Sequence, residues 1–184
     1  MKTIREYQTW PHWKSADYPM DHLPNVVSGS ERNRDPWKLN PDYQRAACWA
    51  DDQASRFVGH LISDGPVPPI FLQRYDSTAN VPSGKRCVEM PIEVIDGQQR
   101  IRAMLRWMAD EIPASMDDGA ALWFRDLTED EVRGLPFINV RFVDLSREER
   151  LRFYLRLNRG GTVHTDEEIQ RVQTMLATEI EATP

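Results

Sequence analysis

The chain has 184 residues, 40% of them hydrophobic, which is enough for one well-buried core and short for two domains. Its 23 basic and 29 acidic residues give a formal net charge of -6. That balance argues against a protein that coats nucleic acid through bulk electrostatics, although it leaves room for a local basic groove. No apolar run approaches the length of a membrane-spanning helix and the start lacks a signal peptide, so we expect a cytoplasmic protein without a membrane partner.

Two cysteines, Cys48 and Cys87, lie far apart and have no metal-type partner at short spacing. In a reducing compartment two buried thiols are commoner than a disulfide. Both are therefore expected to be small core residues.

The N-terminal residues 1–38 carry tryptophans among prolines and charges and show little periodicity. This pattern predicts an irregular arm packed on the core, with residues 39–184 forming a single domain. From Asp51 onward apolar residues recur at helical spacing until Gly65 and Pro66, which predicts an amphipathic helix.

Three segments have the composition of strands. Residues 70–72 and 88–95 are apolar and are separated by a turn-rich loop at 76–84, and Pro91 forces a break or an edge position in the second segment. Residues 137–143 alternate well enough to predict a third strand.

Three further helices are expected. Apolar residues from Ile101 onward form a helical stripe. Ser146 with Glu149, and Thr165 with Glu168, have the spacing of capping boxes and predict the starts of the last two helices. The predicted fold is a single small mixed α/β (α+β) domain with a mixed sheet, flanking helices and the irregular arm.

Residues 92–101 run from a predicted strand directly into a helix, whose first N–H groups and dipole favour an anion. Gly97 allows the backbone to come close to a ligand. Gln98 and Gln99 offer amide donors, and Arg100 supplies a planar guanidinium group suited to phosphate oxygens. We therefore expect phosphate at this turn.

Asp96 has two interpretations. As the N-cap it would satisfy the first turn of the helix, which is the commoner role of a single Asp before a helix. As a functional group it could bind Mg²⁺ through its carboxylate or accept a proton from an attacking hydroxyl, and phosphoryl transfer needs both. A strand, an Asp-Gly pair and a helix are by themselves a weak signal, because such turns are common.

The complete string Asp-Gly-Gln-Gln-Arg at 96–100 resembles the signature of one branch of the ParB/sulfiredoxin-like superfamily. This branch includes the N-terminal domain of GmrS-type modification-dependent restriction enzymes. Upstream, Pro-Asp-Tyr-Gln-Arg at 41–45 and Trp49 resemble the opening Tyr-Gln-Arg…Trp block of that family. Downstream, Asn-Arg-Gly-Gly-Thr at 158–162 resembles its closing Asn-x-Gly-Gly block, so the resemblance spans roughly residues 39–172.

The resemblance implies that the turn holds nucleotide phosphates. ParB proteins bind and hydrolyse CTP, sulfiredoxin uses ATP, some relatives are kinases of free amino acids, and the restriction subunits hydrolyse nucleotides. Sulfiredoxin has its catalytic cysteine where this chain has Gln98, so reduction of a sulfinic acid is not expected. The residues assigned to the nucleotide are Asp96, Gly97, Gln98, Gln99 and Arg100 in the turn, with Asp96 as the metal ligand, Gln44 and Arg45 upstream, and Asn158, Arg159, Gly160 and Gly161 as a third wall.

Other residues in these blocks have a functional and a structural interpretation. His164 is a candidate general base or contact to a substrate hydroxyl, although an exposed position at the start of a helix is the commoner role. Tyr43 could stack a base, and Arg102 and Thr162 are candidate contacts to the substrate or DNA. Core packing is expected for Trp49, and the glycines after Asn158 also fit an ordinary helix C-cap.

The first functional hypothesis is an enzyme that moves a phosphoryl group from a nucleoside triphosphate (ATP, GTP or CTP) to a hydroxyl group with Mg²⁺. Asp96 would be the metal ligand or base, and Arg45 and Arg100 would steady the phosphates. The resemblance to phage-type members that stand alone implies a hydroxymethylated pyrimidine of DNA as the acceptor, by family analogy.

Two alternatives remain. The chain could hydrolyse a nucleoside triphosphate and sense modified DNA in a restriction or anti-phage system, and it would then need a separate nuclease because it has no room for a histidine-rich nuclease domain. It could also be a ParB-like DNA-binding module switched by nucleotide, although the helix-turn-helix reader and dimerisation tail of ParB proteins are not visible. The sequence leaves open whether the chain is a monomer or a homodimer.

Overall fold

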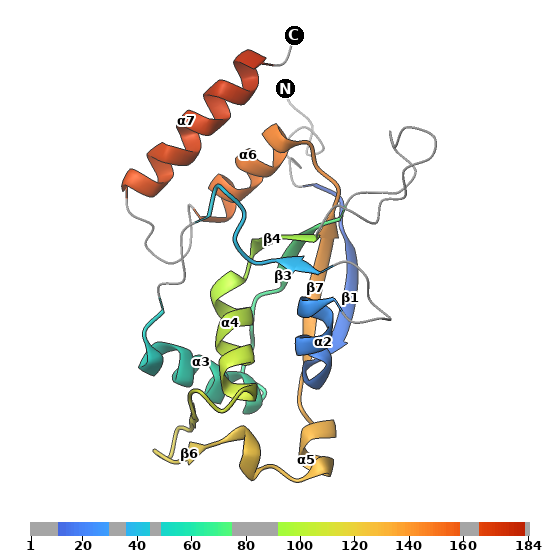
Figure 1. The fold of residues 1–184 in the computed structure, drawn as a ribbon, viewed down its shortest axis with the longest axis vertical. Helices are drawn as coiled ribbons and strands as arrows, with labels where there is room; N and C mark the ends of the chain where they lie inside the picture. Colours follow the sequence, from blue (N-terminus) through green and yellow to red (C-terminus); the bar gives the residue numbers. More distant parts are fainter. Residues whose placement is uncertain (1–10, 30–35, 45–48, 75–91, 159–165, 183–184) are drawn as a thin grey trace, which may run out of the picture.

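The computed structural model describes residues 11–29, 36–44, 49–74, 92–158 and 166–182 (Figure 1). Cys48, Cys87 and the loop at 76–84 lie outside the described residues. The elements in chain order are β1 (Lys14–Pro19), η1 (Met20–His22), α2 (Leu23–Ser28), β2 (Trp37–Lys38), α3 (Asp51–Ile62), β3 (Ile70–Gln73), β4 (Ile92–Asp96), α4 (Gln98–Met108), β5 (Ala114–Ser115), β6 (Ala121–Leu122), η3 (Phe124–Asp126), α5 (Glu129–Arg133), β7 (Phe137–Val143), α6 (Arg147–Asn158) and α7 (Asp166–Ala182).

A five-stranded mixed sheet has the order β1-β7-β3-β4-β2. β7 pairs antiparallel with β1 and parallel with β3, β3 pairs antiparallel with β4, and the short β2 pairs parallel with β4. β5 and β6 form a separate two-stranded sheet. The prediction of a mixed α/β fold is confirmed.

The expectation of an irregular arm is wrong for the described part of residues 1–38. β1 lies along β7 in register from Lys14 opposite Phe142 to Pro19 opposite Phe137, and β2 forms the other edge of the sheet. Most of the β1 side chains are exposed or half-buried, because an edge strand with one neighbour needs no apolar face of its own. Because β1 is held mainly by backbone hydrogen bonds to β7, its sequence shows little alternation of apolar and polar residues.

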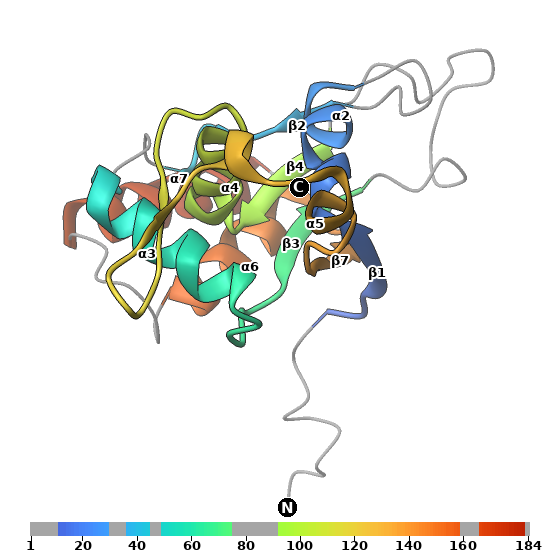
Figure 2. The ribbon, with the colours of Figure 1, turned by 90° about the horizontal axis from the view of Figure 1, so that it is seen from below.

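Side chains of the central strands alternate between two apolar cores, as the two-residue period of a strand requires. On β3, Ile70 and Leu72 belong to the larger core, whereas Phe71 belongs to the second. The larger core packs the sheet against α2, α3 and α4, of which α3 and α4 lie side by side in Figure 2. The second core packs it against α6 and α7 and consists of Tyr43, Phe71, Ile95, Val143, Leu151, Phe153, Tyr154 and Val172.

The helix starts follow local rules. At α6 the backbone N–H of Ser146 donates to Glu149 Oε2 (2.8 Å) and the backbone N–H of Glu149 donates to Ser146 Oγ (3.3 Å), which confirms the predicted capping box. α5 begins with a second box, Thr128 with Glu131, that was not predicted. Thr165 lies outside the described residues, so the box before α7 stays a prediction.

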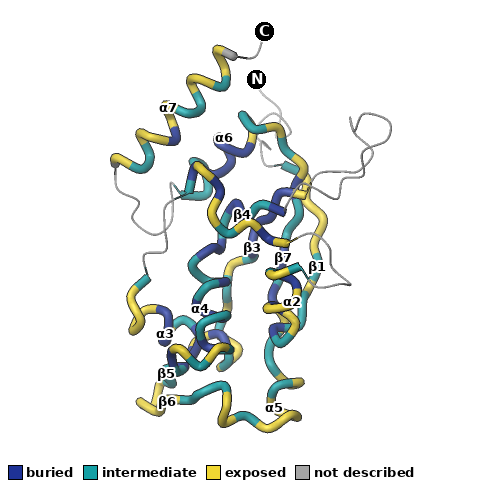
Figure 3. Tube along the Cα trace, in the orientation of Figure 1, coloured by how far each residue is buried: buried dark blue, intermediate teal, exposed yellow. Residues whose placement is uncertain are grey.

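Burial is greatest in the middle of the molecule and lower at its ends (Figure 3). At one end α7 packs on α6 and is largely exposed or half-buried, whereas β3, β4 and α4 in the middle hold many buried residues. In the described ranges no helix has the length and apolarity needed to cross a bilayer.

A nearly buried ion pair connects β4 to α6 through the second core. Arg150 Nη1 lies 2.7 Å from Glu93 Oε2, and the two side chains are only 8% and 13% exposed. Lys38 Nζ lies 3.2 Å from the other carboxylate oxygen, Glu93 Oε1. Removing one member of such a pair leaves a charge in a place from which water is largely excluded.

We predict that Arg150→Ala lowers the free energy of unfolding by about 3 kcal/mol, because Glu93 would keep only its contact with Lys38. The matched control is Arg56→Ala, which breaks the pair between Arg56 and Asp52 (2.9 Å) whose side chains are 68% and 67% exposed. This control should cost less than about 0.5 kcal/mol. Urea unfolding of both variants measures the difference, and equal losses would contradict the assignment.

Candidate functional site

A cavity of about 400 Å³ lies where the three sequence blocks meet. One wall is the turn from β4 to α4, and the others come from the segment before α3, the start of β3 and the last turns of α6. The blocks, far apart in sequence, therefore converge on one site. The lining residues are Gln44, Trp49, Pro68, Pro69, Phe71, residues 95–100, Tyr154, Leu157 and Asn158.

The turn between β4 and α4 is made by Gly97. Its φ of 99° lies in the left-handed region, and it occupies the N-cap position, with its carbonyl accepting from the Ile101 N–H at 2.9 Å. Asp96 instead ends β4, so its interpretation as the N-cap is wrong. Gly97 has no side chain with which to cap α4, and the first turn of the helix, from Gln98 onward, lines the cavity. The N–H groups at a helix start favour an anion.

Arg100 and Asp96 form an ion pair on the wall of the cavity. Arg100 Nη2 lies 2.5 Å from Asp96 Oδ2, while Nη1 donates to the Pro68 carbonyl oxygen and lies 3.4 Å from the Pro69 carbonyl oxygen. The Arg100 side chain is 12% exposed and that of Asp96 is 35% exposed. Arg100, expected to face phosphate, is therefore already engaged by groups of the protein itself.

Gln44 supports the end of β4. Its Nε2 donates to the carbonyl oxygens of Val94 (2.6 Å) and Ile95 (2.7 Å). β2 ends at Lys38, so the Gln44 amide continues the pairing of the β4 edge where the neighbouring strand stops. Gln44 lines the cavity, as expected, but this amide nitrogen is used to hold the strand.

The two glutamines of the turn are linked to Asn40. The Nε2 of Gln98, a residue that is 6% exposed, donates to Asn40 Oδ1 at 2.5 Å, and Gln99 Nε2 donates to Gln98 Oε1 at 3.3 Å. Arg102 Nη2 donates to the same Asn40 oxygen at 2.8 Å. Arg102, expected to contact the substrate or DNA, is not among the residues that line the cavity.

Tyr43 does not present its ring to a ligand. It is 1% exposed, belongs to the second core, and packs edge to face against Tyr154 with ring centroids 5.3 Å apart. The prediction that it stacks a base is corrected by this burial. Trp49, expected in the core, is half-buried and packs against the larger core and Phe57, with ring centroids 5.3 Å apart, and it also lines the cavity.

The third block is described only at its first residue. Asn158 is the last residue of α6, lines the cavity, and donates from Nδ2 to the Tyr154 carbonyl oxygen at 2.7 Å. The others lie outside the described residues and stay predictions, as does the second phosphate-facing cation of the first block. These residues are Arg45, Arg159, Gly160, Gly161, Thr162 and His164.

Several lining residues were missed by the sequence reasoning. Tyr154 lies four residues before Asn158, so helical spacing from the motif asparagine could have identified it. Pro68 and Pro69 precede β3 and their carbonyl groups contact Arg100, while Phe71 on β3 lies opposite Asp96 on β4. The lining therefore combines aromatic residues with polar side chains.

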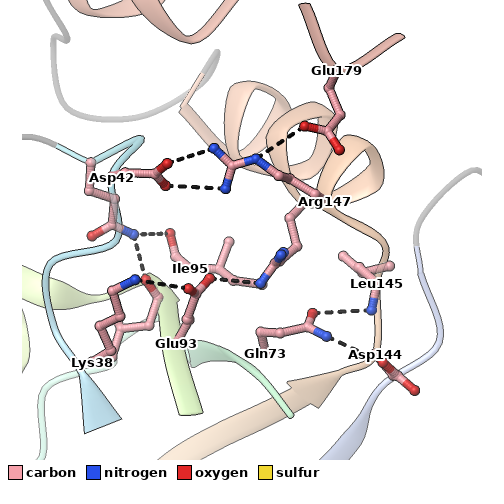
Figure 4. A network of polar contacts seen from close by, with 12 residues as sticks. Lys38, Asp42, Gln73, Glu93, Ile95, Asp144, Leu145, Arg147 and Glu179 are labelled. Atoms are coloured by element: carbon pink, nitrogen blue, oxygen red, sulfur yellow. Dashed lines mark hydrogen bonds and ion pairs between the residues drawn. The ribbon is translucent and has the colours of Figure 1, made fainter. Parts of the chain in front are cut away.

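A network of ion pairs holds the turn at 41–44 against α6 and α7 (Figure 4). Arg147 Nη2 lies 2.6 Å from Asp42 Oδ2, and its Nε lies 3.2 Å from Glu179 Oε2 on α7. Arg171 donates to the carbonyl oxygens of Asp42 (2.9 Å) and Tyr43 (3.1 Å). The hydrogen bond from Arg147 lowers the pKa of Asp42 below its ordinary value and raises the pKa of Arg147.

A second cavity of about 580 Å³ lies between α3, α4 and the start of β7. Most of its lining is apolar, including Leu61, Met104 and Phe137. It shares Arg100 and Pro68 with the first cavity, so these two residues form a wall between the two spaces.

We predict that Gly97→Ala lowers the free energy of unfolding by about 3 kcal/mol. A Cβ atom here would lie 2.9 Å from Ile70 Cγ1, in addition to the strain of a positive φ. The matched control is Gly119→Ala, at φ 85° with no atom within 4 Å, which should cost only about 1 kcal/mol of backbone strain. Urea unfolding gives both values, and a smaller loss at position 97 than at 119 would overturn the packing argument.

The stabilising effect of Asp42 should depend on pH. Its folded pKa is depressed from 3.8 by Arg147, so its stabilisation is present above pH 3.8 and is lost as the pH falls through the lower folded pKa. We predict that Asp42→Asn is less stable than the wild type at pH 7, by less than about 1 kcal/mol because half of the side chain is exposed. Urea unfolding at several pH values should show the difference shrinking in acid, and a growing difference would contradict this sign.

Residues 23–133, more than half of the chain, match the family model described as GmrSD restriction endonuclease, N-terminal domain. Curated proteins give no significant match. One solved structure that is similar to this chain is that of the C-terminally truncated chromosome-partitioning protein ParB from Caulobacter crescentus, complexed with CTP-gamma-S. It has 15% identity and a TM-score of 0.42 over 92% of this chain, which spans 66% of the ParB chain. From the family match we conclude that this chain belongs to the GmrSD N-terminal domain family.

Proposed function

We propose that this chain binds a nucleoside triphosphate in the 400 Å³ cavity and transfers its terminal phosphoryl group. One observation carries the proposal: the start of α4, the Asp96 carboxylate and several aromatic residues border the same cavity. Its volume lies in the usual range for small-molecule sites, about 300–1,000 Å³. Its mixed polar and aromatic lining suits a ligand that carries both phosphates and a flat ring.

The start of α4 would hold the phosphates. The first turn of α4 lines the cavity, helix N-termini favour anions, and Gly97 lets the ligand approach the backbone closely. Asn158 borders the same space from the end of α6. The family blocks would add Arg45 and Arg159 to this side.

Trp49 would hold the nucleobase. It is half-buried on the cavity wall, whereas Phe71 and Tyr154 are buried, and stacking on an aromatic ring tolerates any base. Trp49 also packs against Phe57, with ring centroids 5.3 Å apart. This part of the proposal does not discriminate among ATP, GTP and CTP.

The described lining carries little net charge, because its only charged side chains are Asp96 and Arg100, which form a pair. The several negative charges of a triphosphate therefore need a further cation. In the described ranges no cluster of three or more His, Cys, Asp or Glu could hold a metal unaided. Mg²⁺ is commonly bound by one or two carboxylates together with substrate phosphates and water, and the donor set of one exposed carboxylate fits that pattern.

Asp96 has the geometry for this role. Its Oδ2 is bound by Arg100, while its Oδ1 makes no hydrogen bond or ion pair with the described residues. Asp96 would hold Mg²⁺, and the chemistry this ion would supply is neutralisation of the charge that develops on the phosphate oxygens. Arg100 could turn from Asp96 to a phosphate oxygen without leaving the cavity wall.

In the transfer step the oxygen of an acceptor hydroxyl attacks the terminal phosphorus. The bond from this phosphorus to the bridging oxygen breaks, and the nucleoside diphosphate leaves with the electron pair of that bond. The acceptor proton passes to the Asp96 carboxylate or to solvent. N–H groups at the start of α4 would stabilise the negative charge of the transferred group.

For the acceptor we propose the hydroxyl of a hydroxymethylated pyrimidine in DNA. Family membership favours a DNA-related role, because the matched family is that of a restriction endonuclease domain. The same observation supports a second candidate, hydrolysis of the nucleotide to sense modified DNA for a separate nuclease. The two candidates differ only in whether the acceptor is a DNA hydroxyl or water.

The experiment that tests the proposal follows the terminal phosphate. Purified protein is incubated with γ-labelled ATP, GTP or CTP, Mg²⁺, and DNA containing ordinary or hydroxymethylated pyrimidines. Label in DNA establishes a kinase and identifies its acceptor. Free phosphate, especially when modified DNA stimulates its release, establishes the sensing hydrolase. If no nucleotide is bound or turned over, the proposed function is wrong.

We predict that Asp96→Asn lowers turnover by about 10²–10⁴-fold because the metal ligand or base is lost. Nucleotide binding in EDTA should be as tight as in the wild type or tighter, since Arg100 is released and a negative charge is removed. The matched control is Asp52→Asn, which removes an aspartate paired with an arginine four residues later on an exposed helix face. Full turnover by a folded Asp96→Asn protein would show that the site assignment is wrong.

A further inference from the structure

Asn40 occupies a position between β2 and the first sequence block and makes two hydrogen bonds with one atom. Its Oδ1 accepts from Gln98 Nε2 at 2.5 Å and from Arg102 Nη2 at 2.8 Å. Both donors lie in the first two turns of α4, 58 and 62 residues away in sequence. Asn40 thus joins the segment after β2 to the turn that borders the cavity.

The direction of these bonds follows from the chemistry of Arg102. A guanidinium group has only N–H donors, so the group that faces Arg102 must be the oxygen of the Asn40 amide. That oxygen also faces Gln98, which must therefore present its nitrogen. The Gln98 oxygen is left to accept from Gln99 Nε2 at 3.3 Å. Arg102, through Asn40, sets the orientation of both amides in the turn.

Burial makes this orientation matter. Gln98 is 6% exposed and its acceptor Asn40 is exposed, so removing the Asn40 oxygen would leave a largely buried donor that depends on solvent for a partner. The amide would then rotate toward another partner at the start of α4, and binding a ligand there would first require the turn to be ordered again. Sites whose supporting contacts are removed bind more weakly for this reason.

We propose that Asn40 is a positioning residue for the anion-binding turn and that Arg102 acts through it rather than on the ligand. This inference rests on the proposed function, because it assumes that a nucleotide binds in the 400 Å³ cavity. Neither residue lines the cavity, so their effect on binding passes through Gln98.

The experiment separates the acceptor oxygen from the volume of the side chain. Asn40→Leu keeps a similar volume and removes the acceptor, whereas Asn40→Asp keeps an acceptor oxygen for both donors. Asn139→Leu is the matched control, since this asparagine donates to Asp17 (2.8 Å) between β7 and β1, away from the first cavity. The affinity for fluorescent ATP, GTP and CTP analogues with Mg²⁺ and the thermal midpoint are measured for each protein.

We expect Asn40→Leu to weaken nucleotide binding about tenfold, and Asn40→Asp to remain within about threefold of the wild type. Asn139→Leu should leave the affinity unchanged, and the two Leu variants should have similar thermal midpoints. A Kd for Asn40→Leu equal to that of the wild type overturns the inference. So does an Asn40→Asp protein that binds as weakly as Asn40→Leu, because the acceptor oxygen would then be irrelevant.

A second pair of variants keeps the test valid should Asn40→Leu not fold. Arg102→Ala removes one donor to Asn40, and Arg106→Ala removes an arginine of the same helix that pairs with Asp51 (2.8 Å) and Glu111 (3.2 Å). Only Arg102→Ala should weaken nucleotide binding, by about threefold, and equal effects overturn the inference. If the wild type binds none of the nucleotides, the proposed function fails, which is a different result from binding that Asn40 does not affect.

Discussion

The guanidinium group of Arg100 connects the parts of the chain on which the site depends. It binds the Asp96 carboxylate at the end of β4 and the carbonyl oxygens of Pro68 and Pro69 before β3, while its own backbone forms the first turn of α4. A planar group with donors on two sides suits this task, because it can hold a carboxylate and a bent backbone segment at once. Together with Pro68 it also lines both cavities and lies between them.

The polar groups around the first cavity stabilise the fold, and in the proposed function they would also support binding of a ligand. Gln44 completes the edge of β4, Gln98 is bound to Asn40, and Arg100 holds Asp96. A buried polar group without a partner is costly, so a site built from such groups must satisfy them internally before a ligand arrives. In the proposed function, an exchange of partners at Arg100 would accompany binding of the phosphates, and the supporting amides would keep the turn in place.

The second core and its ion pairs determine where the first sequence block lies. Tyr43 is buried against Tyr154, and Arg147 and Arg171 hold the backbone and carboxylate of Asp42 from α6 and α7. Packing and charge thus act on the same short turn. Because Gln44 follows directly and reaches both the cavity and β4, the placement of α6 and α7 bears on the site even though α7 does not line it.

Local patterns in the sequence determined the elements that depend on neighbouring residues only. The strand, the glycine turn and the helix around residues 92–108, the capping box of Ser146 with Glu149, and the family assignment are all visible in this way. Tertiary structure decided the rest. β1 and β2 are strands because they pair with the edges of β7 and β4. Alternation of apolar and polar residues in their own sequences does not predict this pairing. Tyr43 is buried while Trp49 lines the cavity, and Arg100 binds Asp96 and Pro68. Local sequence did not predict these outcomes, because they depend on segments that are distant in sequence and meet only when both cores have packed.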